Sequence, residues 1–314
     1  MSFLGAEIDW PMVVARAVHF AATATIAGVL MFRAVVADPA LRGQGKITLV
    51  VDQQIRWLAW IGLVLTAISG AAWLLLQTSA MSGQPSSEAI ASGALLTVVE
   101  ETQFGMVSEV RLVLALLLAI CLASDHRPLP RWLATGAALC LVAAVAWTGH
   151  AGSTPYKLGY LHVTADALHL CAAAAWTGGL MSLVLLLRAV SRNAAAGSLE
   201  LDAVRRFSTL GMVSVATLIV TGVVNAWILV GSFRALIVTD YGWVLMTKLA
   251  IFVVMIAFAA VNRFWLTPQL VPPACTDALR RLTRNTKAEI VLAFIVFAVV
   301  GLLGTLHPAA HLVK

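Results

Sequence analysis

The chain has 314 residues, of which 61% are hydrophobic and 11% are charged, and its mean hydropathy is +0.92. Soluble domains carry about 25% charged residues, so a soluble fold is excluded, because these few charges could not cover its apolar surface. The net charge is +6, and in membrane proteins such a basic excess gathers in cytoplasmic loops. It is therefore no sign of nucleic acid as a partner. The sequence predicts an all-α polytopic membrane protein.

Eight segments are apolar over the length of about 20 residues that a membrane-spanning helix needs. In chain order they cover residues 11–37, 55–77, 105–124, 131–149, 159–188, 207–232, 242–265 and 286–306. The first begins at Pro11 without the basic segment of a signal peptide. In the fifth, Gly178 and Gly179 predict the close approach of another helix. The longest connection, 78–104, is expected to be a solvated loop, so residues 1–314 are expected to form a single transmembrane domain.

The basic residues divide unequally between the two sides of the membrane. One side carries fifteen of them: Arg33, Arg42, Lys46, Arg56, Arg127, Arg131, Arg188, Arg192, Arg205, Arg206, Arg263, Arg280, Arg281, Arg284 and Lys287. The other side carries three: Lys157, Arg234 and Lys314. Because cytoplasmic loops are enriched in Lys and Arg, we expect both termini outside, that is, N-out and C-out.

Motifs of nucleotide-driven and hydrolytic chemistry are absent from the sequence, which has no GxxxxGK[ST], GxGxxG, HExxH or GxSxG. The cysteines stand singly, without the CxxC spacing of a zinc or thiolate copper site. They are Cys121, Cys140, Cys171 and Cys275. We therefore expect no enzyme, and any transport to be passive or coupled to an ion gradient or a partner.

Six of the seven histidines fall in the outer half of the predicted bundle, and only His126 lies on the cytoplasmic side. At a rise of about 1.5 Å per residue, His19 lies about 12 Å and His169 about 15 Å below the outer ends of their spans. Ionisable groups inside spans are costly and are candidates for function. Imidazole is a ligand for Cu, Zn, Fe or Ni, so a metal or cofactor site open to the outside is expected.

The fifth span carries the strongest local pattern. His162, Asp166 and His169 are spaced i, i+4, i+7, so they share one face of a helix. A carboxylate one turn from an imidazole can orient it as in metal-bound histidines, and His19 could supply a further ligand. An ion pair between Arg16 and Asp166 that joins the first and fifth spans, or a proton relay, would account for the same residues.

Other polar side chains of the outer half are expected to form an access path and to support the site. His150 ends the fourth span at the outer interface. The expected access path consists of Met106, Glu109, His307 and His311. The side chains expected to support the ligands are Arg16, Asn225 and Lys248.

Several short strings resemble one known family. They are Thr148-Gly149-His150, the His162/Asp166/His169 face, Trp176-Thr177-Gly178-Gly179, Arg206-Phe207-Ser208, Thr221-Gly222-Val223-Val224-Asn225-Ala226-Trp227, Gly231-Ser232, Tyr241-Gly242 and Lys248. In this order and spacing they resemble the copper resistance D (CopD) family of bacterial inner-membrane proteins. The resemblance extends over the whole chain and is most specific in the C-terminal half.

The resemblance implies copper homeostasis in the bacterial inner membrane, with copper imported from the periplasm and a CopC-type periplasmic copper chaperone as partner. By position it makes His19, His150, His162, Asp166 and His169 the candidate copper ligands, and it leaves Cu(I) and Cu(II) both open. The alternative is a haem b electron-transfer protein in which His19 and His169 are the axial ligands. A sensor or assembly factor that only binds copper is a third hypothesis.

Overall fold

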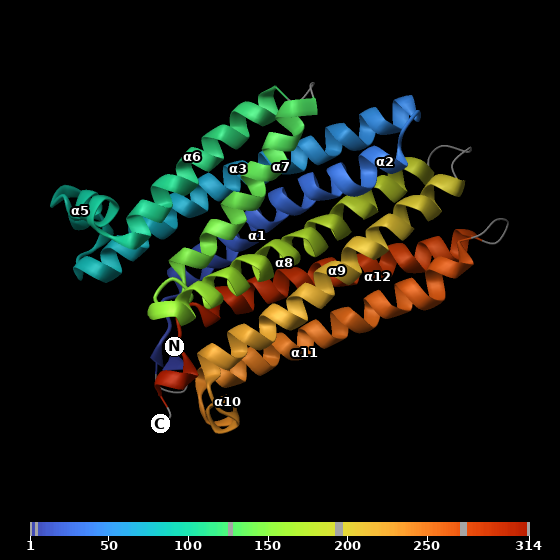
Figure 1. Cartoon of the computed structure of the whole chain (residues 1–314). Helices are drawn as coiled ribbons and strands as arrows, with labels where there is room; N and C mark the ends of the chain where they lie inside the picture. Colours follow the sequence, from blue (N-terminus) through green and yellow to red (C-terminus); the bar gives the residue numbers. More distant parts are fainter. Residues whose placement is uncertain (1, 4–5, 125–127, 192–196, 271–274, 313–314) are drawn as a thin grey trace.

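The structure is a computed structural model that describes residues 2–3, 6–124, 128–191, 197–270 and 275–312. Long helices run side by side through it, and both ends of the chain lie at the same end of the bundle (Figure 1). In this described part, eight helical segments are long and apolar enough to cross a membrane. They are Trp10–Ala40, Gly45–Ser82, Gln103–Ala123, Pro128–Thr148, Tyr156–Ser191, Leu199–Val230, Asp240–Gln269 and Asp277–Leu303. The predicted eight spans and the all-helical fold are confirmed.

The elements follow one another with short connections. The helices are α1 (Trp10–Phe32), α2 (Asp38–Ala40), α3 (Gly45–Ser82), α4 (Ser86–Ala91), α5 (Ala94–Glu101), α6 (Gln103–Ala123), α7 (Pro128–Ala143), α8 (Tyr156–Ser191), α9 (Gly197–Val230), α10 (Phe233–Val238), α11 (Asp240–Val261) and α12 (Cys275–Leu303). Wider or tighter helical turns continue three of them at Arg33–Ala37, Ala144–Thr148 and Asn262–Gln269, and a last turn covers Ala309–His311. Two short strands, β1 (Ser2–Phe3) and β2 (Ala6–Glu7), pair antiparallel before α1.

Two predictions, the bounds of the second span and the loop 78–104, differ from the structure. α3 extends from Gly45 to Ser82, beyond the predicted 55–77, because hydropathy marks only the part of a helix that lies in lipid. The connection 78–104 is helical over much of its length, since it contains the end of α3 and the short helices α4 and α5. A polar composition alone therefore does not identify a loop here.

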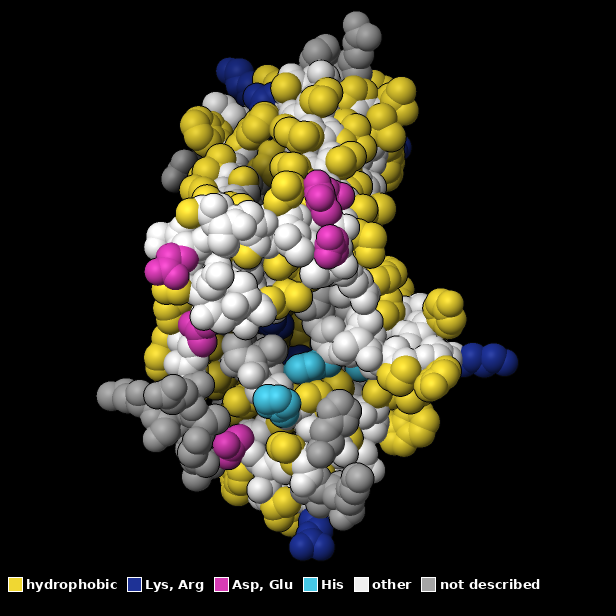
Figure 2. Space-filling view, turned by 90° about the vertical axis from the view of Figure 1, so that its left-hand side faces the viewer, with side chains coloured by type: hydrophobic (Ala, Val, Ile, Leu, Met, Phe, Trp, Pro, Cys, Tyr) yellow, Lys and Arg dark blue, Asp and Glu magenta, His cyan; other side chains and the backbone are white. Residues whose placement is uncertain are grey.

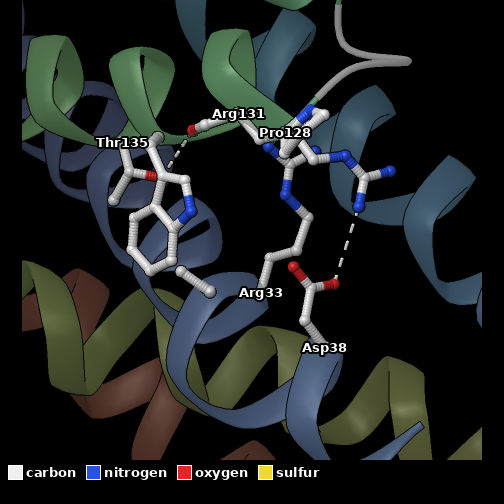
Figure 3. A pocket seen from close by; sticks show the side chains of 7 residues that line it. Arg33, Asp38, Pro128, Arg131 and Thr135 are labelled. Carbon is white, nitrogen blue, oxygen red and sulfur yellow. Dashed lines mark hydrogen bonds and ion pairs between the residues drawn. The ribbon is translucent and has the colours of Figure 1, made fainter. Parts of the chain in front are cut away.

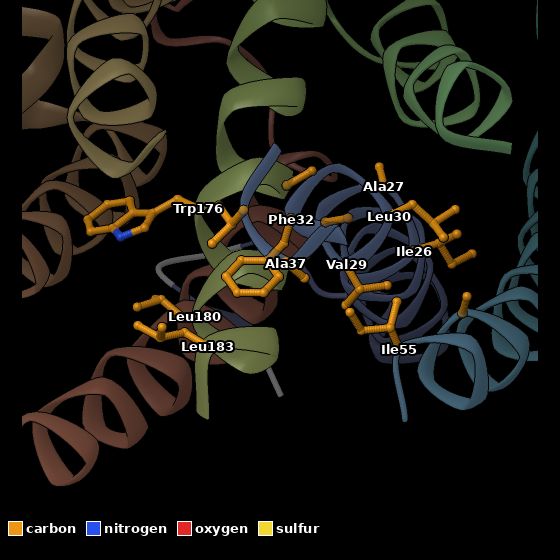
Figure 4. Packing of buried hydrophobic residues seen from close by; sticks show 14 of the residues in the cluster. Ile26, Ala27, Val29, Leu30, Phe32, Ala37, Ile55, Trp176, Leu180 and Leu183 are labelled. Carbon is orange, nitrogen blue, oxygen red and sulfur yellow. The ribbon is translucent and has the colours of Figure 1, made fainter. Parts of the chain in front are cut away.

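The helix α1 forms the centre of the bundle, where it packs against α3, α8, α12 and α7. Ile26, Ala27, Val29 and Leu30 are fully buried, and Figure 4 shows how they pack against side chains of the neighbouring helices. A helix enclosed on all sides is apolar around its whole circumference. This explains why α1 is largely apolar and why its few polar side chains meet other helices rather than lipid.

The crossing of α1 and α8 is close because glycines lie at the contact. A Cβ atom on Gly28 would lie 1.9 Å from the carbonyl oxygen of Ala174, and one on Gly178 would lie 2.6 Å from the Cα of Gly28. Gly179 instead faces α9, since a Cβ atom there would lie 2.7 Å from the ring of Phe207. The predicted close approach at these two glycines is confirmed.

Charged side chains tie three helices together at the end of the bundle opposite the termini. Arg33, after α1, lies 3.8 Å from Asp52 of α3, and Arg131 of α7 pairs with both Asp52 and Asp38. Arg33, Asp38 and Arg131 border a cavity of about 380 Å³, drawn in Figure 3. Because Arg33 is almost completely buried, this network belongs to the packing of α1, α3 and α7.

Candidate functional site

The end of the bundle that carries the termini is hollowed near its centre (Figure 2). Histidine side chains lie at the border of this hollow, and basic side chains are visible deeper inside it. The first turn of α1 and the last turn of α12 both lie at this end (Figure 1). The hollow is therefore the opening through which a solute would approach the candidate ligands.

His162, near the start of α8, is held by a neighbouring hydroxyl. Its Nδ1 atom lies 2.7 Å from Oγ1 of Thr154, and that hydroxyl donates its own proton to the carbonyl oxygen of His150 at 3.1 Å. When the threonine proton goes to that carbonyl oxygen, Nδ1 of His162 is the donor in this pair. The imidazole is then in the tautomer whose Nε2 atom carries a free lone pair.

His169, two turns further along α8, is held in the same way by α9. Its Nδ1 atom lies 2.9 Å from Oγ1 of Thr221, which donates to the carbonyl oxygen of Thr217 at 2.6 Å. When the hydroxyl proton goes to that carbonyl oxygen, Nδ1 of His169 is the donor and Nε2 carries the lone pair. Gly222 lies beside the ring, and a Cβ atom there would be in ordinary contact with it, 3.5 Å from its Cε1.

Asp166 lies between the two histidines and turns toward α9 and α11. Its Oδ1 atom accepts a hydrogen bond of 3.0 Å from Nδ2 of Asn225. The ammonium group of Lys248 on α11 acts electrostatically on both Asp166 and His169. The supporting positions predicted for Asn225 and Lys248 thus lie beside the ligand face.

The expected ion pair between Arg16 and Asp166 is not formed within the described residues. Asp166 uses the amide of Asn225 on α9, whereas the guanidinium of Arg16 lies over the ring of Trp73 on α3, 4.8 Å from its centroid. The two side chains leave the contact between α1 and α8 in different directions. The position of a residue along its span does not determine the direction in which its side chain points.

His150 lies in the turn after α7, outside the membrane spans, and faces Tyr241 of α11 with their ring centroids 6.3 Å apart. Burial, followed by the positive charge of Arg16 and the neighbouring His162, lowers the pKa of His150 below its usual value. Its Nε2 atom is buried and has no hydrogen-bond partner. The lowered pKa favours the neutral form of this imidazole.

His19 belongs to a different set of contacts, made with α3 and α6. Its Nδ1 atom lies 3.0 Å from Oγ of Ser69, whose proton goes to the carbonyl oxygen of Leu65 at 2.6 Å. Its Nε2 atom is bonded to Nη2 of Arg111. Both ring nitrogens are thus in use, and His19 shares no hydrogen-bond partner with His169.

The described residues of the expected access path come from two separate parts of the chain. Met106 and Glu109 are exposed on the first turns of α6, and His307 is exposed after α12. The side chain of His311 lies outside the described part of the structure. Over the side chains that are described, no three His, Cys, Asp or Glu residues form a group that could hold a metal ion. Among these side chains the candidate ligands therefore do not form one closed metal centre.

The structure also contains a buried polar group that no motif in the sequence indicated. Asn262 donates a hydrogen bond of 2.7 Å to Oε1 of Glu289, and Asn285 donates to Asn262 at 3.0 Å. Together with Arg263 and apolar side chains of α8 and α9, Asn262 and Glu289 border a cavity of about 490 Å³. A carboxylate inside the predicted span 286–306 was the available signal.

Comparison with known proteins supports the family resemblance that the short sequence strings indicate. A family model described as copper resistance protein D matches residues 201–303, and one described as the N-terminal domain of copper resistance protein D-like proteins matches residues 7–160. Copper resistance protein D of Pseudomonas syringae pv. tomato is 30% identical over 262 residues, which cover 80% of this chain and 82% of that protein. The chain belongs to the copper resistance protein D family.

Two further proteins are similar to this chain in sequence. The inner membrane protein YebZ of Escherichia coli (strain K12) is 28% identical over 295 residues, which cover 93% of this chain and 97% of that protein. The copper transport protein CutJ of Bacillus subtilis (strain 168) is 29% identical over 201 residues, 60% of this chain and 36% of that protein. No solved structure matches the chain.

This copper resistance protein D family member is a multi-pass protein of the inner membrane, as the sequence predicts. Its family is one of copper resistance and transport. The family and the localisation predicted from the sequence are thereby confirmed.

Proposed function

We propose that this protein imports copper from the periplasm and that the ion passes along His150, His162 and His169, with Asp166 beside the last two. The observation that carries the proposal is the pair of hydroxyl groups, of Thr154 and Thr221, that engage Nδ1 of His162 and His169. A fixed Nδ1–H leaves Nε2 as the donor atom, which is the usual arrangement of metal-bound histidines. Neutral imidazole is a ligand for copper.

The proposal includes an orientation and a partner. With N-out and C-out, which the distribution of Lys and Arg supports, the hollow with the histidines opens to the periplasm. There Met106, Glu109, His307 and His311 would receive copper, in either oxidation state, from a CopC-type chaperone. Membrane lipid surrounds the bundle, no nucleic acid is bound and no reaction is catalysed. Residues 1–314 act as one domain, because α1 packs against helices of both halves.

His19 has a conditional place in this path. Its Nε2 atom becomes a copper ligand only when Arg111 releases it, because both ring nitrogens are engaged. The same contact bears on the haem alternative, in which Nε2 of His19 and of His169 would face one iron. An absorption spectrum of the purified protein separates the two functions. We expect no Soret band, and a strong one would favour the haem protein.

Copper import is tested in proteoliposomes that contain the full chain. We expect accumulation of copper that depends on the protein and that falls about tenfold or more in His169→Ala and in His162→Ala, since each removes a ligand. His126→Ala, which removes a histidine predicted on the opposite side, is the control and should accumulate copper like the wild type. Vesicles that take up no more copper with the protein than without it would rule out import.

A further inference from the structure

Two arginines in the outer half of the bundle are buried without the carboxylate that normally accompanies such groups. Arg16 of α1 and Arg111 of α6 are each only 7% exposed. Neither is within ion-pair distance of an Asp or Glu in the part of the chain that is described, and Arg16 makes no hydrogen bond there. A buried guanidinium without a counter-charge is unfavourable, so these two groups require an explanation.

The two guanidinium groups converge on one indole. Arg16 lies 4.8 Å and Arg111 lies 5.4 Å from the ring centroid of Trp73, which is fully enclosed. Three N–H groups at this place are buried and have no hydrogen-bond partner: Nε of Arg16, Nε of Arg111 and Nε1 of Trp73. His19 lies edge-on to the same ring, with its centroid 5.6 Å away. Donors gather here, and apart from Nε2 of His19, which contacts Arg111, the described residues offer these three N–H groups no acceptor.

The donors lie at the hollow end of the bundle. Arg16 extends toward the outer end of α12, where a Cβ atom on Gly304 would lie 2.0 Å from its Nη2. Its charge also acts on His150 in the outer turn after α7. Basic side chains are visible inside the hollow in Figure 2. A small solute from the outside therefore has a route toward these groups.

We propose that Arg16, Arg111 and Trp73 form a binding site for a small oxyanion, a carboxylate or a phosphate group, that enters from the outer face. Guanidinium groups present a planar set of donors that matches the two oxygens of such anions, and charged hydrogen bonds of this kind are strong. The indole N–H adds a third donor. The anion supplies both the missing acceptors and the missing negative charge.

The site also bears on copper, and this consequence rests on the proposed import. Because the charge of Arg16 acts on His150, it would also oppose a copper cation held there. A bound oxyanion would neutralise this repulsion. Anion binding itself does not depend on copper import and can be measured when copper is absent.

The test is equilibrium dialysis of the purified full-length protein, freed of phospholipid, against radiolabelled inorganic phosphate. We expect one saturable site per chain, with acetate as a competitor. Arg16→Gln and Arg111→Gln should weaken phosphate binding at least tenfold. Trp73→Phe keeps an aromatic ring but removes one donor, and should weaken binding by a smaller factor. Arg234→Gln removes an exposed charge at the same end and should bind phosphate like the wild type.

Two further arms complete the test. Arg111→Lys keeps the positive charge in case the Gln variants fail to fold, and should still bind phosphate less tightly because lysine offers no planar pair of donors. Competition by phosphatidylglycerol added to the micelles would identify a lipid headgroup as the source of the phosphate group, and its failure to compete would identify a free anion. Absence of saturable phosphate binding in the wild type, or equal binding by wild type and all Arg16 and Arg111 variants, would overturn the proposal.

Discussion

Thr221 and Thr154 determine which nitrogen of each α8 histidine is free. Each hydroxyl lies within hydrogen-bond distance of a backbone carbonyl oxygen and of Nδ1 of an imidazole. A hydroxyl has only one proton to give, so when the carbonyl oxygen receives it, the ring nitrogen must be the donor. In the proposed copper path, the orientation of His162 and His169 thus depends on residues that bind no metal.

Replacing the hydroxyl at Thr221 should weaken copper binding without removing a ligand. In Thr221→Val, His169 loses the acceptor that fixes its tautomer, and we expect copper affinity to fall about 10- to 100-fold. The control is Thr217→Val, one turn earlier on α9, whose hydroxyl bonds only to the carbonyl oxygen of Val213. Titration of both variants against a competing copper chelator measures the difference. Equal affinities for the two variants would show that Thr221 does not orient His169.

Some residues of the candidate site could be recognised in the sequence, and others could not. The histidines and Asp166 stand out in the sequence because ionisable groups are rare in spans. The hydroxyls do not, because a Ser or Thr in a helix usually bonds to its own backbone, and no spacing distinguishes those that also meet a histidine. The same holds for Trp73, which no pattern in the sequence distinguishes from the other tryptophans.

Among the helices, α1 combines two tasks that require close packing. It crosses α8 at Gly28, and it carries Arg16 and His19 into the contacts with α3 and α6. Helices in a membrane are held together by such close contacts of small residues and not by a hydrophobic driving force. The position of the ligand-bearing helix α8 therefore depends on the small residues of α1.

A methyl group at Gly28 should separate α1 from α8. The Cβ atom would meet the backbone of Ala174, which cannot yield without movement of a helix, so we expect Gly28→Ala to lower stability by about 1–3 kcal/mol. Gly136→Ala in α7 is the matched control, because nothing lies within 4 Å of its Cβ position. There the better helix propensity of alanine should leave stability unchanged or raise it by up to about 1 kcal/mol. Thermal unfolding of both purified variants decides, and an unchanged melting temperature in Gly28→Ala would contradict the close crossing.

Across the whole molecule, the two ends of the bundle differ in charge and in the chemistry of their buried groups. The histidine half contains the buried Arg16 and Arg111 and the half-buried Lys248, whereas the opposite end carries the Arg33–Asp52–Arg131 network. The two ends of the bundle therefore differ in their buried charged groups. The excess of Lys and Arg at the end opposite the termini predicts that this end faces the cytoplasm.

The orientation predicts the behaviour of reporter fusions. Alkaline phosphatase joined to the C-terminus should be active, because that enzyme needs the oxidising periplasm to form its disulfides. The control is the same reporter placed after Ser191, at the predicted cytoplasmic end of α8, which should be inactive. Enzyme activity of the two fusions in intact cells is the measurement. The reverse pattern would place the histidines on the cytoplasmic side and exclude import through them from the periplasm.

The amino-acid sequence was sufficient to establish the eight spans and the family, and it predicts an orientation, because hydropathy, charge and short motifs are properties of neighbouring residues. It also identified His162, Asp166 and His169 as one face of a helix. The sequence alone could not show which side chains these residues contact. Asp166 meets Asn225, and Arg16 meets Trp73, because the rotation and packing of whole helices determine which side chains meet. That Arg16 and Arg111 meet no carboxylate among the described residues could be recognised only in the tertiary structure, since the lack of a counter-charge is a property of the space around a side chain.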